Sequence, residues 1–442
     1  MPDQDNEPEL HPPATIIRHN QPRRGVHHAW TTDRRTWAFR CGVVEPAKYA
    51  PAGHAALFLA EMSRLLSPAF VGIEEPISPP APPLDLVTWP EAFLPAETLV
   101  AVLRGLLGHD RCPCIHVGLR PNALSDGTHL FTYAQLSDLV LALRGLSSTI
   151  SDDLEAFAQW LAAAAMWGHY NVACVFMIDV DGALRVCLHP KNTASPHEIS
   201  GLPDHTVHEA DFGAVVTLAP REQAIYAVHL QPLICSDLLD LTRAEPGYGP
   251  RAALNADPQR FGPQTPEKLD IVSVVTCTPQ ANEATGHRPA SPTWQPKFRS
   301  AFLAPLEGGT LVRHAEAVVV LSNVRTIIQR HGGLSGCYVP EPLPRQTDFG
   351  DWSRVWSWGR AGGDSGWSLL EGEGPSVDWK SEAHLVTLEP DYVAGLIAED
   401  HMFAFTITRF PRARPRLERA ATLASVEIRS LGRWTDTDGS GQ

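Results

Sequence analysis

The chain has 442 residues, of which 43% are hydrophobic and 19% charged. This is enough apolar material for a large core, and the length fits two or three domains or one large α/β unit. The formal net charge of −14 argues against a nucleic-acid-binding surface, which needs concentrated positive charge.

The sequence pattern shows no sign of membrane insertion or export. No apolar run approaches the length of a membrane span, and residues 1–25 lack the apolar core of a secretory signal. Eight cysteines occur singly, apart from Cys112 and Cys114, so no disulfide framework is predicted. We expect a soluble cytoplasmic protein with no membrane partner.

The first elements are an arm, a strand and a helix. Residues 1–29 are polar and contain several prolines, which predicts a flexible N-terminal arm. Residues 35–44 have the composition of a strand. Residues 53–66 place large apolar side chains on one helical face, and the Pro-rich segment 76–83 is a stiff connector.

A short buried strand is predicted at residues 84–89, and it ends at Pro90. Glu91 follows directly, at the end of a strand where open α/β sheets bind their ligands. Residues 97–107 predict a helix and residues 114–120 a further strand.

Two strand pairs follow a long helix. The helix is predicted over Ser151–Trp167, with Ser151 as its N-cap. Residues 171–191 predict two strands joined by a turn at Asp181 and Gly182, and they end at Lys191. Residues 213–235 predict another pair, whose last strand delivers Cys235.

The second half of the chain alternates strands with polar segments. Residues 242–267 predict an excursion over the surface, and the Trp-rich segment 340–380 an irregular insertion. Further strands are predicted at 269–277, 315–323, 384–388 and 402–410.

Three reactive groups thus follow three separate strands: Glu91, Lys191 and Cys235. Acyl transfer through a thiol requires such a set. A carboxylate takes the thiol proton, and an ammonium group favours both the thiolate and the oxyanion that forms on attack. The amide of Ser236 is a second candidate donor to that oxyanion. Asp237 is expected to brace the turn rather than react.

The segments that carry these groups are "LDLVTWPEAFLP", "HPKNTASPHE" and "LICSDLLDL". In this order they resemble the three motifs of the nitrilase superfamily of carbon–nitrogen hydrolases, which places Glu91, Lys191 and Cys235 in its catalytic triad. Glu198, seven positions after Lys191, matches the second glutamate of the nitrilase branch, and His197 precedes it as in that pattern.

The resemblance implies one α/β domain over residues 30–415, a four-layer α-β-β-α sandwich with insertions at 242–267 and 345–380. Residues 416–442 would form a C-terminal tail. Relatives pair through a helical face, which implies a homodimer or higher homo-oligomer. Two departures are visible: Ser236 replaces an aromatic residue, and "LVRHA" at Leu311–Ala315 replaces a helical signature that supports the site and the subunit contact.

The activity implied is hydrolysis of a non-peptide C–N bond in a small amide or nitrile, without metal or organic cofactor. Cys235 forms the thioester, Glu91 moves the protons, Lys191 stabilises the oxyanion, and Glu198 positions substrate or tunes Lys191. Two alternatives remain open. In the first, the chain is a catalytically inactive scaffold for ligand sensing or partner binding. In the second, it is an acyltransferase in which an amine resolves the thioester.

Two further clusters have plain structural explanations. His109, Cys112, Cys114 and His116 are metal-type ligands, but their spacing differs from the usual zinc pairs and they fall on a predicted strand. The tryptophans at 352–379 could stack a ligand, although packing of the insertion is favoured. Gly-rich segments lack the strand–helix context of a phosphate loop, so nucleotide binding is not predicted.

Iodoacetamide should alkylate Cys235 faster than the other seven cysteines, because a neighbouring ammonium group favours the thiolate and a neighbouring carboxylate can accept the thiol proton. Peptide mass spectrometry after timed labelling measures each rate. Slow labelling without selectivity would favour the inactive scaffold instead.

Overall fold

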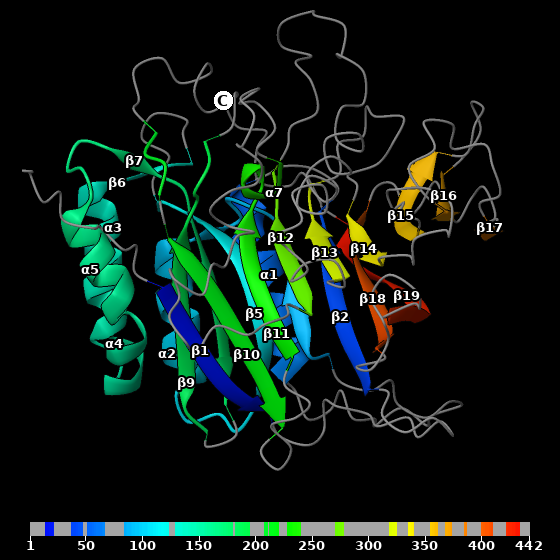
Figure 1. The fold of residues 1–442 in the computed structure, drawn as a ribbon, viewed down its shortest axis with the longest axis horizontal. Helices are drawn as coiled ribbons and strands as arrows, with labels where there is room; N and C mark the ends of the chain where they lie inside the picture. The colour runs from blue at the N-terminus through cyan, green and yellow to red at the C-terminus, as the bar shows by residue number, and fades with distance from the viewer. Residues whose placement is uncertain are drawn as a thin grey trace, which may run out of the picture.

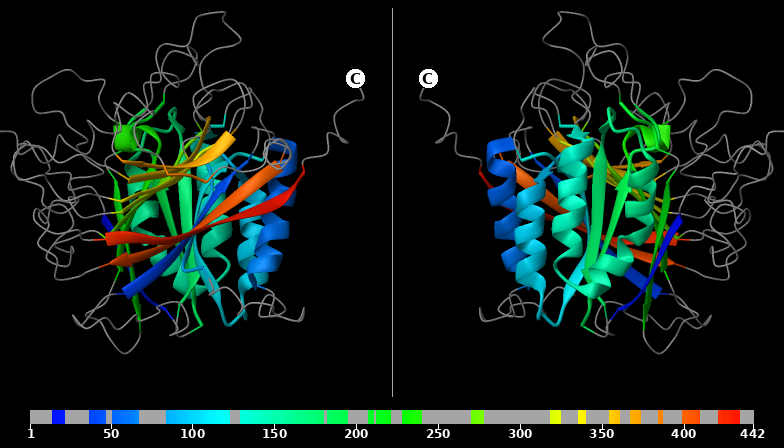
Figure 2. Two further views of the ribbon diagram at one scale, coloured as in Figure 1. Left: turned by 90° about the vertical axis from the view of Figure 1, so that its right-hand side faces the viewer. Right: turned by 90° about the vertical axis from the view of Figure 1, so that its left-hand side faces the viewer.

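Two large β-sheets face each other, and a layer of helices covers the outer side of one of them (Figures 1 and 2). The structure is a computed structural model. It describes residues 14–21, 37–46, 51–66, 84–122, 129–179, 182–194, 207–210, 212–220, 228–239, 270–277, 318–324, 335–339, 354–360, 367–373, 384–386, 399–409 and 421–433. The fold is mixed α/β, as the sequence predicts.

The eight-stranded sheet carries the helices. Its strand order is β19-β18-β2-β3-β5-β8-β9, with the short β4 beside β5. The strands β2, β3 and β5 run parallel, and the other pairs of the main path are antiparallel. In sequence order the strands are β2 (Trp37–Glu45), β3 (Leu86–Thr88), β4 (Leu94–Pro95), β5 (Cys112–Arg120), β8 (Val172–Ile178), β9 (Leu184–Pro190), β18 (Glu399–Arg409) and β19 (Ala421–Arg433).

The nine-stranded sheet has the order β1-β10-β11-β12-β13-β14-β15-β16-β17. Its central strands β11, β12 and β13 are parallel, as are β1 and β10 at one edge. Its strands are β1 (Ala14–Gln21), β10 (Gly213–Pro220), β11 (Val228–Ile234), β12 (Ile271–Val275), β13 (Val318–Ser322), β14 (Gly336–Val339), β15 (Arg354–Arg360), β16 (Trp367–Glu373) and β17 (His384–Val386). A third, two-stranded sheet joins β6 (Phe131–Thr132) to β7 (His169–Tyr170).

Amphipathic helices bury their apolar stripe on the eight-stranded sheet (Figure 2). On α2 the buried residues Leu99, Leu103 and Leu106 recur every three or four positions, which is the helical period. Within the described ranges the five longer helices lie on this side, and the short α7 follows β11. The helices are α1 (Pro51–Leu66), α2 (Ala96–Leu106), α3 (Tyr133–Arg144), α4 (Ser148–Asp153), α5 (Glu155–Ala163) and α7 (Ser236–Leu239).

The prediction of one long helix over 151–167 is wrong. Two shorter helices, α4 and α5, replace it, with a break at Leu154. Ser151 is not the N-cap, because Ser147 accepts the hydrogen bond from the Ile150 amide and starts the helix earlier. Sequence analysis also missed α3, which begins at a capping box of Thr132 and Gln135.

Regular strands also occur where the sequence predicted irregular segments. The N-terminal arm contains β1, which pairs with β10, and the C-terminal tail contains β19, which pairs with β18. The Trp-rich segment contains β15 and β16, an antiparallel pair that extends the nine-stranded sheet. Trp352 and Trp379 lie outside the described residues.

The two sheets are joined by buried polar contacts as well as by apolar packing. The Thr88 and Ser273 hydroxyls lie 2.8 Å apart, and the Ser273 hydroxyl lies 2.8 Å from His116 Nδ1. His116 Nε2 lies 3.1 Å from His189 Nε2. We call Thr88, Ser273, His116 and His189 the interlayer network. It links β3, β5 and β9 of one sheet with β12 of the other.

All eight cysteines lie within described residues and are free thiols. His116 belongs to the interlayer network, and the described residues contain no group of three side chains placed to hold a metal ion. None of the helices in the described segments is both long and apolar enough to cross a bilayer.

The histidines of the interlayer network make stability depend on pH. Burial lowers the pKa of His189 to about 3. Burial, and then the neighbouring His189 ring, lower the pKa of His116. An unfolded histidine binds a proton below about pH 6.5. Between that pH and the folded pKa the unfolded state therefore binds more protons, so stability falls as pH falls.

The variant His189→Gln tests this linkage. Between about pH 8 and pH 5 the unfolding free energy of the wild type should fall by about 2 kcal/mol more than that of the variant. Urea unfolding at the two pH values measures the difference. An equal fall in both proteins would contradict a neutral, buried His189.

Candidate functional site

Glu91 is buried in a tight turn between the two sheets, and only 3% of it is exposed. The turn is fixed by backbone bonds to both sheets. The Glu91 amide donates to Thr276 O at 3.2 Å, and the Gly118 amide donates to Pro90 O at 3.0 Å. The next residue, Ala92, has a φ of 53°, in the left-handed region that non-glycine residues rarely adopt. The turn thus holds the Glu91 carboxylate at the end of β3.

Gly118 on β5 permits this turn. A Cβ at this position would lie 2.3 Å from Glu91 Cα and 2.5 Å from the Ala92 nitrogen. Both contacts are to backbone, which cannot swing aside as the end of a long side chain does. The turn that carries Glu91 therefore requires glycine at position 118.

Lys191 follows β9 and forms an ion pair with Glu91, 2.9 Å from Nζ to Oε1. Both side chains are almost fully buried. The Lys191 amide donates to Asn171 O at 2.8 Å, which aligns the ends of β8 and β9. The two groups come from positions 100 residues apart in the sequence.

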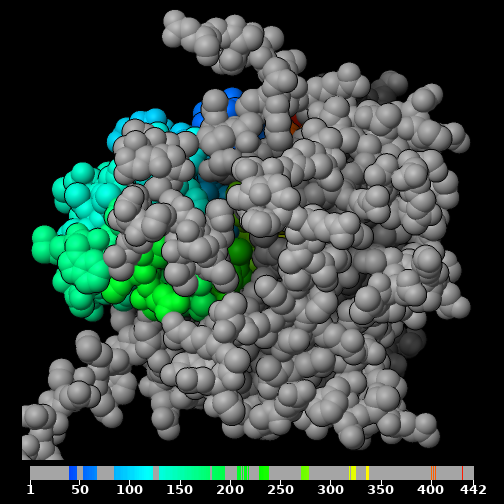
Figure 3. Space-filling view, turned by 90° about the horizontal axis from the view of Figure 1, so that it is seen from above, coloured from blue at the N-terminus to red at the C-terminus, as the bar shows by residue number. Residues whose placement is uncertain are grey.

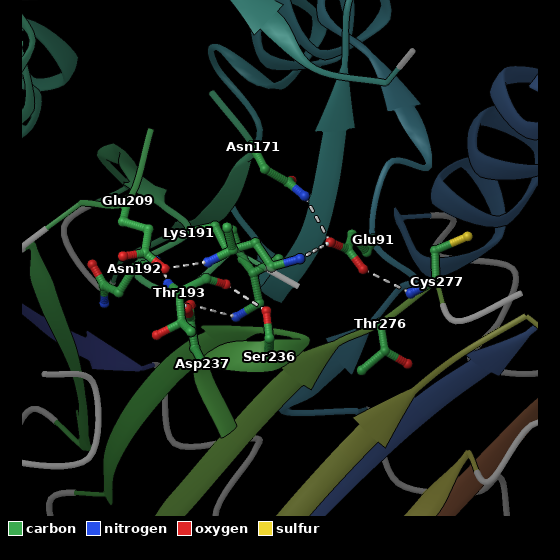
Figure 4. Close-up of polar contacts among 12 residues, drawn as sticks. Glu91, Asn171, Lys191, Asn192, Thr193, Glu209, Ser236, Asp237, Thr276 and Cys277 are labelled. Carbon is green, nitrogen blue, oxygen red and sulfur yellow. Dashed lines mark hydrogen bonds and ion pairs between the residues drawn. The ribbon is translucent and has the colours of Figure 1, made fainter. Parts of the chain in front are cut away.

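Both oxygens of the Glu91 carboxylate accept hydrogen bonds. Oε1 accepts from Lys191 Nζ and from Asn171 Nδ2, the latter at 2.7 Å, and Oε2 accepts from the Cys277 amide at 2.9 Å. Figure 4 shows Asn171 and Lys191 converging on one oxygen while Cys277 approaches the other. These donors stabilise a carboxylate that is otherwise desolvated.

Cys235 lies at a sharp elbow between β11 and α7. Its φ is 45°, a left-handed value that costs about 1–3 kcal/mol in a non-glycine residue. The Cys235 amide donates to Val275 O at 2.8 Å, and the side chain packs in a small cluster with Ala173, Ile234 and Val275. Backbone strain of this kind concentrates at functional sites, and a strand–elbow–helix turn also presents the nucleophile of serine hydrolases.

Asp237 joins the elbow to the segment after Lys191. Its Oδ1 accepts from the Asn192 and Thr193 amides, each at 2.8 Å, and its Oδ2 accepts from the Ile234 amide at 3.1 Å. The Ser236 hydroxyl donates to Thr193 O. Burial raises the pKa of Asp237 to about 7, against the lowering effect of the Lys191 charge and the backbone donors. Asp237 therefore braces the turn, in the role that the sequence predicts.

Two of the predicted residues meet directly, and hydrogen bonds connect the turn of the third to the segments around them. Glu91 and Lys191 touch directly. The Cys235 amide donates a hydrogen bond to Val275, which lies two positions before Cys277, the residue whose amide donates to Glu91. The next two residues, Ser236 and Asp237, form hydrogen bonds with the segment after Lys191. Figure 3 views this end of the molecule, where atoms of the helix layer and of the neighbouring strands reach the surface.

Glu198 lies outside the described residues, so its predicted role stays a prediction. Sequence analysis missed Asn171 and Cys277, which contact Glu91 from positions 80 and 186 residues away. It also missed Glu209, whose Oε1 accepts from the Ala194 amide at 3.1 Å. The one available signal was that Asn171, like Lys191, adjoins the end of a predicted strand.

The other thiols are poor nucleophiles. Burial raises the pKa of Cys112, Cys114, Cys174 and Cys187 above the ordinary thiol value, which keeps them protonated. Cys277 is partly exposed, but burial and the Glu91 charge raise its pKa while Lys191 opposes them.

A scan against protein-family models and a search of curated protein sequences both find no match. The chain's own residues therefore carry what can be inferred about its chemistry.

Gly118→Ala tests the packing of the Glu91 turn. The added Cβ should displace the turn, lower the unfolding free energy by about 1–3 kcal/mol and slow the alkylation of Cys235. Thermal unfolding and timed iodoacetamide labelling measure the two effects.

The matched control is Gly105→Ala on α2, where a Cβ meets no atom within 4 Å. Alanine favours a helix over glycine, so this variant should be as stable as the wild type or more so. Equal behaviour of the two variants would contradict the requirement for glycine at position 118.

Proposed function

We propose that the chain is a thiol-dependent hydrolase of a non-peptide C–N bond, of the amidase or nitrilase type. The carrying observation is the buried Glu91–Lys191 ion pair, together with the strained Cys235 elbow whose next two residues hold the segment after Lys191. A buried ion pair is weak support for stability, because desolvation offsets its Coulomb attraction. Its placement at the ends of β3 and β9, joined through the segment after Lys191 to the turn that carries the Cys235 thiol, favours a chemical role.

The first half of the reaction acylates Cys235. Glu91 takes the thiol proton as the sulfur attacks the carbonyl carbon of an amide, and the C=O electron pair moves to oxygen. Collapse of this intermediate breaks the C–N bond. Glu91 gives its proton to the nitrogen, so that ammonia or an amine leaves and a thioester remains.

The second half clears the thioester. Glu91 takes a proton from water, the hydroxide attacks the carbonyl carbon, and the thiolate leaves with the electrons of the C–S bond. The proton held by Glu91 returns to the sulfur, so the enzyme is regenerated. If an amine resolves the thioester instead, the same residues perform acyl transfer.

In this proposal the Lys191 ammonium and a backbone amide after Cys235 stabilise the negative charge of the oxyanion. The Lys191 ammonium faces Glu91 and lies beside the segment held by Asp237, where it would offset the oxyanion of both intermediates. The amide of Ser236 is the second proposed donor. The reaction draws every proton transfer and every stabilising charge from side chains and amides of the chain, so we propose no cofactor.

The family-level features belong to the same proposal. A nitrilase-type sandwich would have a fourth layer of helices on the outer face of the nine-stranded sheet, and its chains would pair as homodimers or larger homo-oligomers. Two facing sheets with a helix layer over one of them agree with three of those four layers. The substrate would be a small amide or nitrile.

Cys235→Ala tests the proposed nucleophile. Ammonia release from a panel of short primary amides and nitriles should fall to the uncatalysed level, and circular dichroism should show an unchanged fold. Glu91→Gln should lower turnover by about 10²–10⁴-fold, because the general base is lost.

The control is Cys337→Ala, which removes another buried thiol and should retain turnover. Hydroxylamine added to the wild type should yield a hydroxamate if a thioester forms. Full turnover by the Cys235→Ala protein would overturn the assignment.

A further inference from the structure

The interlayer network lies on the same strands as the candidate site, and each of its members precedes a site residue by two to four positions. All four members are buried between the sheets, and Thr88, Ser273 and His116 have no exposed surface. A continuous chain of contacts of 2.8, 2.8 and 3.1 Å runs from Thr88 through Ser273 and His116 to His189. Buried polar groups destabilise a core unless they are paired, so a chain of four polar side chains between the sheets calls for an explanation.

On two strands, the histidines precede site residues by two positions. His189 and Lys191 lie on one face of the β9 path, and His116 and Gly118 lie on one face of β5. Lys191 forms the ion pair, and Gly118 receives the Glu91 turn. A shift of either histidine would therefore move one partner of the site.

The two hydroxyl residues also precede site residues along the chain, by three and four positions. Thr88 ends β3, three positions before Glu91. Ser273 lies on β12, four positions before Cys277, whose amide holds the Glu91 carboxylate. The network thus connects β3, β5, β9 and β12. These strands carry or precede Glu91, Gly118, Lys191 and the Cys277 amide, respectively.

The contact between the imidazoles adds a directional constraint. Two facing Nε2 atoms form a hydrogen bond when one carries a proton and the other does not, and two N–H groups would repel. Burial disfavours the charged form of both rings and so keeps each one neutral. The network consequently holds a defined geometry rather than a loose polar cluster.

We propose that His116 and His189 are positioning residues: their contact fixes β9 relative to β5 within the eight-stranded sheet, and the His116–Ser273 contact fixes β5 relative to β12, so that Lys191 meets Glu91 and the Cys277 amide reaches its carboxylate. This inference rests on the proposed function, because the readout is the reactivity of Cys235. It assigns the histidines no contact with substrate. They act through the strands that carry the reacting groups.

The test compares His189→Ala with His189→Gln. Alanine removes the partner of His116, whereas glutamine places an amide at about the position of the imidazole Nε2 and restores a hydrogen bond. The rate of Cys235 alkylation by iodoacetamide is measured across pH for each, beside thermal unfolding. Cys187→Ala is the matched control, because Cys187 lies on the same face of β9, two positions farther from Lys191.

We expect His189→Ala to slow Cys235 alkylation by about 10- to 100-fold through misplacement of the partners. Its pH profile should move toward that of Glu91→Gln, and His189→Gln should recover most of the wild-type rate. Cys187→Ala should lose stability without loss of reactivity.

A wild-type rate in a folded His189→Ala protein would overturn the positioning role and leave the proposed function intact. Equal slowing in His189→Ala and Cys187→Ala, in proportion to lost stability, would also overturn it. If wild-type Cys235 reacts no faster than the other thiols, the proposed function itself fails. If His189→Ala does not fold, the rate of Cys235 alkylation in His189→Gln decides. Recovery of most of the wild-type rate in a folded protein supports the positioning role, and loss of the rate overturns it.

Discussion

The buried ion pair between Glu91 and Lys191 is the interaction on which the site depends. Two opposite charges removed from water lose several kcal/mol of solvation each, and their attraction offsets this only when further hydrogen bonds complete the geometry. The chain supplies those bonds from Asn171 and from the Cys277 amide. The donors come from both sheets, so the full set of hydrogen bonds to the Glu91 carboxylate forms only when the two sheets pack in register.

The remaining features of the site serve that register. Gly118 lets the turn of Glu91 approach β5, and Asp237 ties the Cys235 elbow to the segment after Lys191. Each sheet has a run of three parallel strands, and the carboxyl ends of neighbouring parallel strands share one edge. A thiol, a carboxylate and an ammonium group delivered by β11, β3 and β9 therefore gather at one end of the sandwich.

The sequence predicted many of the local elements, and the strand-end positions of Glu91, Lys191 and Cys235, because both leave short-range signals. Apolar runs that stop at a proline or a polar turn marked the strand ends at Glu91 and Lys191. Helix boundaries were less predictable, since Ser147 and Ser151 are both acceptable caps and tertiary packing chose the earlier one. Cys277 left no signal and Asn171 only its position beside a predicted strand, because their contacts with Glu91 arise from the packing of distant strands. The strands β1 and β19 were missed for the same reason, as their pairing partners decide their structure.

A double-mutant cycle on Glu91 and Lys191, read out as the rate of Cys235 alkylation, tests most directly whether the three groups act as one unit. The variants are Glu91→Gln, Lys191→Met and the two combined, each checked for an unchanged fold. If the groups form a single assembly, each single variant slows the reaction and the double variant is no slower than the slower single one. Independent effects that multiply in the double variant, or wild-type rates in both single variants, would contradict the assembly.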